Sequence, residues 1–88
     1  MEKIDLSRIN ELCLPYMKRP KKIIGAKVVL LDDIKNKAGD RMERGEVAII
    51  WQSFRGYGLK AVHDGVEKVI ARVSHYSVRF LKDGYEKM

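Results

Sequence analysis

Cysteine, long apolar runs and catalytic motifs are scarce or missing in this sequence of 88 residues. Its single cysteine, Cys13, allows no intramolecular disulfide, so we expect a reducing and cytoplasmic setting. The longest apolar runs, residues 28–31 and 47–51, fall far short of the ~20 residues that a membrane helix needs. Because the first residues include Glu2 and Asp5 and no continuous apolar stretch, we expect no signal peptide and no membrane partner.

Side chains that bind metals or perform catalysis are few and scattered. Cys13, His63 and His75 are not spaced like zinc ligands, so the sequence predicts no metal site and no cofactor. Ser74, His75 and Ser77 are close in sequence, but a catalytic triad is defined by geometry rather than by proximity along the chain. With no nucleophile elbow and no phosphate-binding loop, we predict no catalytic residue and a non-enzymatic protein.

The composition that remains is that of one small, basic, folded domain. Hydrophobic residues make up 45% of the chain and charged residues 34%, which excludes a disordered tail. Lys and Arg number 18 against 12 Asp and Glu, for a net charge of +6. Residues 16–45 alone carry nine basic and four acidic side chains, so the positive charge is a local feature of the first half.

An amphipathic helix is predicted near the N-terminus, over residues 6–14. Apolar residues at helical spacing form one stripe, namely Ile9, Leu12, Cys13, Tyr16 and Met17. Asp5 or Ser7 can cap its start, and Pro15 disfavours its continuation. We expect this helix to bury Ile9, Leu12 and Tyr16 across one end of the β domain; docking onto a partner chain is the alternative. An exposed basic connector follows at residues 18–22.

Five strands are predicted after the connector, at residues 26–31, 47–54, 59–62, 66–73 and 78–81. A long polar loop at residues 32–46 separates the first two, and residues 55–58 form the next break. An Asp-Gly turn at residues 63–65 and a 3₁₀ turn at residues 74–77 precede the last two strands. The chain therefore divides into a helix with its connector (1–22), a β domain (23–82) and a polar tail (83–88).

The two segments GAKVVLL at 25–31 and RGEVAI at 44–49 resemble the G-x-K-V…G-x-V opening of SH3-like barrels. KOW-type ribosomal and transcription modules share this opening, and so do SH3-like accessory subunits of electron-transfer enzymes. The long first loop and the 3₁₀ turn before the last strand are also typical of that fold. The resemblance implies a mainly β fold, an SH3-like five-stranded small barrel with a short N-terminal α-helix. An OB-type barrel is the structural alternative.

Residues 51–58 concentrate three of the seven aromatic residues, Trp51, Phe54 and Tyr57, next to Arg55. Exposed aromatic rings stack unpaired bases, and arginine stacks or holds phosphate. Strand alternation places Trp51 on the same face as positions 47 and 49, which favours a place in the core for Trp51 and leaves the surface as the alternative. Phe54 and Tyr57 are then the expected exposed pair.

These features predict a domain that binds RNA or DNA through a basic face bearing aromatic residues. The predicted contact residues are Lys18, Arg19, Lys21, Lys22, Phe54, Arg55 and Tyr57. The alternative is a protein-interaction module or an accessory subunit of a larger complex. The carboxylates of the long loop favour that alternative because they repel phosphate; they are Asp32, Asp33, Asp40 and Glu43. The sequence leaves the oligomeric state open.

Overall fold

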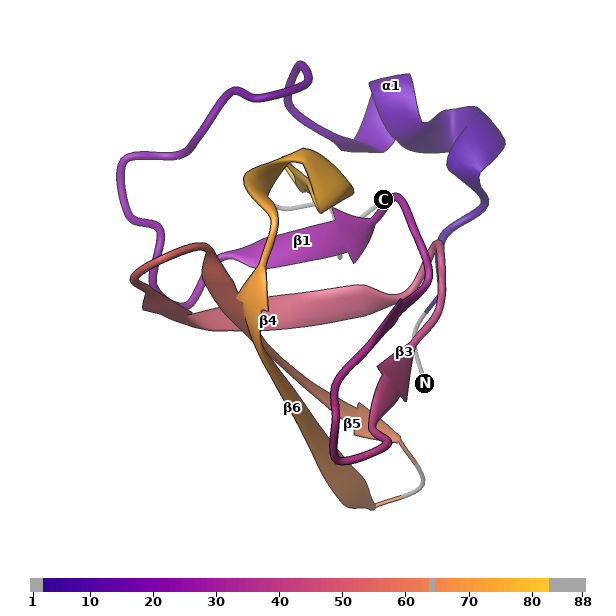
Figure 1. Ribbon diagram of the computed structural model, residues 1–88. Coiled ribbons are helices and arrows are strands. Elements are labelled where there is room, and N and C mark those ends of the chain that lie inside the picture. The colour runs from indigo at the N-terminus through magenta and orange to yellow at the C-terminus, as the bar shows by residue number, and fades with distance from the viewer. Residues whose placement is uncertain (1–2, 64, 83–88) are drawn as a thin grey trace.

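One antiparallel sheet with the strand order β6-β5-β4-β1-β7 organises the chain in a computed structural model that describes residues 3–63 and 65–82. Its strands are β1 (Lys27–Leu30), β4 (Val47–Ser53), β5 (Tyr57–His63), β6 (Val66–Val73) and β7 (Val78–Phe80) (Figure 1). The predicted mainly β class and its five strands are confirmed. Within the described residues the edge strands β6 and β7 are not paired with each other, so closure into a barrel stays a prediction.

The inner face of the sheet holds the main core. On β5 the buried positions alternate as Tyr57, Leu59 and Ala61, as expected for a strand with one face inward. Ala48 and Ile50 face the same core from β4. The other buried members of this cluster are Val28, Leu30, Met42, Ile70, Val73, Val78 and Phe80.

The N-terminal segment packs on outward residues of β1 and β4. A 3₁₀ turn, η1 (Leu6–Arg8), leads into one α-helical turn, α1 (Ile9–Leu12). Asp5 caps the start of η1, because its carboxylate accepts a hydrogen bond from the backbone N–H of Ser7. Leu12 and Cys13 pack on the outward residues Val29 and Val47 in a second apolar cluster. The helix is shorter than predicted because the chain leaves it at Cys13 to pair with Leu81 beside β7.

Tyr16 was expected to be buried by this helix, and that prediction is wrong. Its side chain is 50% exposed, and its hydroxyl donates to the backbone oxygen of Tyr76 at 3.0 Å. The helical stripe cannot extend to Tyr16 because Pro15 follows the helix and Met17 takes a left-handed backbone conformation with φ of 70°.

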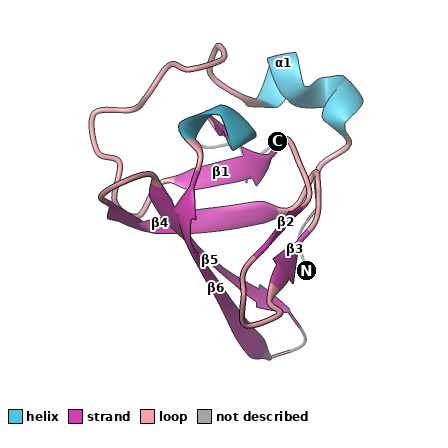
Figure 2. Cartoon of the chain, viewed as in Figure 1, coloured by secondary structure: helices cyan, strands magenta, loops and turns pink. Residues whose placement is uncertain are grey.

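The predicted loop at 32–46 is partly a β ribbon formed by β2 (Ile34–Lys35) and β3 (Arg41–Met42). Figure 2 shows this ribbon beside the β5–β6 hairpin. Asn36 anchors it, because its side-chain amide donates to the backbone oxygen of Val69 on β6 at 3.2 Å. The side chain of Lys68 also reaches across from β6 and donates to the backbone oxygen of Arg41 at 2.9 Å. The segment is therefore a folded arm held against the sheet.

Two bulges and a 3₁₀ turn shape the end of the sheet at the β4–β5 turn. Register shifts occur between Ile50 and Gln52 in the β4–β5 pair and between Tyr57 and Leu59 in the β5–β6 pair. Bulges of this kind bend a strand and re-aim its side chains. The 3₁₀ turn η2 (His75–Ser77) lies between β6 and β7, as predicted, and Ser74 caps it. For the Asp-Gly turn at 63–65, Asp64 lies outside the described residues, although His63 pairs with Val66.

Candidate nucleic-acid interface

The basic connector is exposed and runs down to the turn between β4 and β5. Each of its four cationic side chains is exposed, as predicted: Lys18, Arg19, Lys21 and Lys22. Beyond the connector the backbone N–H of Gly25 donates to the backbone oxygen of Ile50 at 2.7 Å, which fixes the chain beside β4. Figure 1 shows the connector, in purple, descending beside the β4–β5 turn at the left of the view.

The β4–β5 turn presents the predicted pair Phe54 and Arg55 to solvent. Phe54 is 67% exposed, and the guanidinium carbon of Arg55 lies 5.4 Å from the centre of its ring. Gly56 follows with φ of 97°, and a Cβ at this position would lie 2.7 Å from the backbone oxygen of Val73. Only glycine satisfies both conditions, so the turn is packed tightly against the end of β6.

Tyr57 was predicted to be exposed, and the structure contradicts this because the residue is 1% exposed. Strand β5 begins at Tyr57, earlier than predicted, and alternation with Leu59 then turns its ring inward. The ring packs edge-on against Phe80, with centres 5.8 Å apart, and lies against the ring of His75 at 4.3 Å. The buried Tyr57 ring therefore packs beneath the side chain of His75 and does not stack on a ligand.

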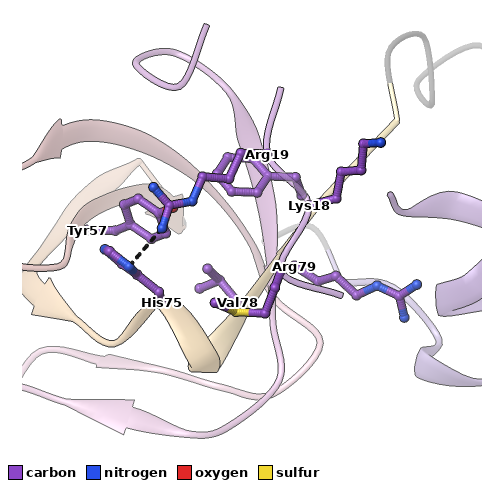
Figure 3. A pocket seen from close by; sticks show the side chains of 8 residues that line it. Lys18, Arg19, Tyr57, His75, Val78 and Arg79 are labelled. Carbon is purple, nitrogen blue, oxygen red and sulfur yellow. Dashed lines mark hydrogen bonds between the residues drawn. The ribbon is translucent and has the colours of Figure 1, made fainter. Parts of the chain in front are cut away.

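Arg19 joins the connector to this buried ring. Its Nη2 atom lies 3.2 Å from Nδ1 of His75, and its guanidinium carbon lies 6.0 Å from the centre of the Tyr57 ring (Figure 3). Because a guanidinium has only donors, Nδ1 of His75 accepts this hydrogen bond. His75 was predicted to lie on the 3₁₀ turn without a functional role. Its contact with a residue 56 positions away is a product of the fold.

Side chains fill the hollow around this contact and leave no room for a substrate. It is lined by Lys18, Arg19 and Arg79 together with Tyr57 and His75, and no carboxylate lines it. Figure 3 shows Lys18 and Arg79 pointing away from the Tyr57–His75 pair. The Arg79 guanidinium is held by the backbone oxygen of Leu14 at 2.7 Å and by Oδ1 of Asn10 at 3.0 Å. Arg79 thus ties the N-terminal segment to β7.

For Trp51 the sequence favoured the core over the surface, and the structure shows the alternative, because 43% of the residue is exposed. The inner face of β4 is the one with Ala48 and Ile50, whereas Trp51 points outward with Ile49. Val47 lies on the same outward face as Trp51, but it is buried there beneath the N-terminal helix. Its apolar side chain therefore made this face resemble the core in the sequence. The helix does not extend over Trp51, so the indole is an exposed ring beside the β4–β5 turn.

Charge is strongly segregated along the chain, and the fold brings the basic segments together. Residues 12–31, 47–63 and 68–82 contain no Asp or Glu but hold eleven of the 18 Lys and Arg residues. These segments supply the connector, the β4–β5 turn and the end of β6 with η2. Arg72 belongs to this region, since its backbone lies within 3.1 Å of the position that a Cβ of Gly56 would take. We call the group Lys18, Arg19, Lys21, Lys22, Arg55 and Arg72 the basic end.

Asp33, Asp40 and Glu43, three of the four carboxylates of the long loop, form bonds within the fold. Oδ1 of Asp33 accepts from the backbone N–H of Arg44 at 2.7 Å, and Glu43 forms an ion pair with Lys3. The pKa of Glu43 is lowered by that hydrogen bond with Lys3. These acids therefore stabilise the arm, and they are supplied by segments other than the three that build the basic end.

Cys13 is buried, and burial raises the pKa of its thiol. Across residues 3–63 and 65–82 no cluster of His, Cys, Asp and Glu has the arrangement to hold a metal ion, and no helix there is long and apolar enough to cross a membrane. No protein-family model, curated protein or solved structure matched this chain.

Proposed function

We propose that this chain is a non-enzymatic domain that binds nucleic acid through its basic end. The observation that carries the proposal is the meeting of acid-free segments around the Arg19–His75 contact and the β4–β5 turn. Clustered cations attract phosphates, release counterions and supply most of the affinity of such complexes. Phosphates would lie along the connector and over Arg55, while Phe54 offers a ring for stacking beside them.

We further propose that the sheet is a small barrel of the SH3-like kind. The long segment between β1 and β4 and the 3₁₀ turn between β6 and β7 support this, since both are features of that fold. A fold of this size presents its loops and turns at its ends. The basic end would then be a loop-built surface on a rigid sheet, with Arg19 held in place by Tyr57 and His75.

A pair of matched double variants tests the proposed function. Lys21→Ala with Lys22→Ala removes two exposed lysines from the basic end, and Lys35→Ala with Lys37→Ala removes two exposed lysines from the folded arm. Both change the net charge equally. We expect the first to weaken binding of a fluorescent oligonucleotide about tenfold in low-salt anisotropy titrations, and the second to weaken it less than about twofold.

The outcomes separate the proposed function from its alternative. Equal losses in the two double variants would show attraction by net charge alone and would contradict a located interface. No binding of any single- or double-stranded oligonucleotide by the wild type at low salt would overturn nucleic-acid binding and favour a protein partner.

A further inference from the structure

Trp51 is the only tryptophan in the chain, and it stands on the open half of the outer sheet face. It is the bulged residue of β4, since the β4–β5 register shifts between Ile50 and Gln52. The neighbouring outward residue Ile49 is also exposed, at 42%. Large exposed aromatic rings are costly to leave in water, so this placement calls for an explanation.

The absence of a side chain at Gly58 makes room for the Trp51 indole. A Cβ on residue 58 would lie 2.8 Å from both Cε2 and Nε1 of the indole, closer than side-chain carbons approach other atoms. The missing side chain therefore lets the indole rest directly on the β5 backbone. A ring held in this way loses little further conformational entropy when a second planar group stacks on it.

A shallow hollow opens beside the indole, between β4, β5 and β6. It has a volume of about 250 Å³ and is lined by Trp51, Lys60, Glu67 and Val69. This is below the ~300–1,000 Å³ of pockets that hold whole small molecules, so it suits one planar group. Lys60 and Glu67 pair at 3.4 Å along its rim and offer both a donor and an acceptor to the edge of such a group.

We propose that Trp51 stacks one unpaired base of a single-stranded nucleic acid whose phosphates lie on the basic end. The inference rests on the proposed function and narrows it to single strands, because the bases of a duplex already stack on each other. Charge complementarity and continuity support it. Trp51 lies three residues before Phe54, and Gly25, just beyond the connector, is hydrogen-bonded to its neighbour Ile50. A strand bound along the connector and the β4–β5 turn would place a base at the indole.

The intrinsic fluorescence of the wild-type chain tests this directly, since all its tryptophan emission comes from Trp51. The probes are a short oligothymidine and an abasic sugar–phosphate oligomer of the same length. We expect the oligothymidine to quench the emission and the abasic oligomer to bind without quenching it. We also expect the oligothymidine to bind on the order of tenfold more tightly than the abasic oligomer.

Variants provide a second and independent readout. Trp51→Phe should keep most of the preference for the oligothymidine over the abasic oligomer, whereas Trp51→Leu should reduce it to the part that stacking on Phe54 supplies. Val62→Ala, which trims another exposed apolar residue on the same sheet face, should leave the preference unchanged. Circular dichroism of each variant verifies the fold.

Two contrary outcomes are distinguishable. Equal affinity of the wild type for the two oligomers, without quenching, would overturn base stacking on Trp51 while leaving phosphate binding by the basic end intact. Absence of binding to both oligomers at low salt would remove the proposed function together with this inference.

Discussion

Glu46 shows how a single residue ties the folded arm to the sheet. Its side chain is fully buried, and its Oε2 atom accepts a hydrogen bond from the backbone N–H of Glu43 at 2.8 Å. Its Oε1 atom has no hydrogen-bond partner among the described residues, and Nζ of Lys68 on β6 lies 3.7 Å from it. A buried carboxylate is costly unless it is paired in this way.

Replacing Glu46 is therefore expected to destabilise the fold in a graded manner. Glu46→Ala leaves the Glu43 N–H without its partner and removes the carboxylate beside the Lys68 ammonium, so it should lower the free energy of unfolding by about 2–4 kcal/mol. Glu46→Gln keeps an acceptor for the N–H and should cost about half as much. Urea denaturation followed by circular dichroism measures both. Equal stability of Glu46→Ala and the wild type would contradict the assigned role.

At the scale of elements, most strands could be predicted from the sequence, because alternating β-branched residues bounded by glycine leave few other solutions. Strand β6 has its predicted bounds of Val66–Val73, and η2 occupies the predicted turn. The faces were harder to predict. Strand β4 is apolar on both sides because the N-terminal helix covers Val47 on the outside. Only the tertiary packing of that helix, which covers Val47 and stops short of Trp51, decides that Trp51 is exposed. Tyr57 lies inside because β5 begins earlier than predicted.

The candidate site was only partly predictable, for a related reason. Exposure of Lys18, Lys21, Lys22, Phe54 and Arg55 follows from their polarity or their place in a turn, and it was predicted. The contact of Arg19 with His75 depends on two chain segments meeting in space. No periodicity or local motif carries that information.

The β4–β5 turn is an element whose shape depends on one glycine, and a matched pair of variants tests this. Gly56 and Gly39 both have positive φ values, 97° and 94°, but only a Cβ on Gly56 would meet backbone atoms. Gly39→Ala should cost about 1 kcal/mol for the left-handed backbone alone. Gly56→Ala should cost roughly 2–3 kcal/mol more, because the Val73 oxygen must move.

Thermal or urea unfolding of the two glycine variants gives the comparison. Since the turn also positions Phe54 and Arg55, Gly56→Ala should weaken oligonucleotide binding even where the protein remains folded. Equal stability losses at the two positions would show that the turn is not held against β6 in the way described.

At the scale of the whole molecule, charge distribution matters more than net charge. A net charge of +6 spread evenly would give weak, unlocalised attraction for polyanions. Here Asp33, Glu43 and Glu46 are bonded within the arm and to the N-terminal segment, while acid-free segments meet around the β4–β5 turn and the Arg19–His75 contact. The fold therefore concentrates a modest net positive charge at the basic end, beside the exposed aromatic rings of Phe54 and Trp51.

The salt dependence of oligonucleotide binding tests this central claim most directly. If about four phosphates are neutralised at the basic end, a plot of log affinity against log salt concentration for a single strand should have a slope of about −3. The wild-type chain and a labelled oligothymidine suffice for this titration. A slope near −3 is the predicted result. Affinity that does not change with salt, or no binding at the lowest salt, would contradict nucleic-acid binding through the basic end.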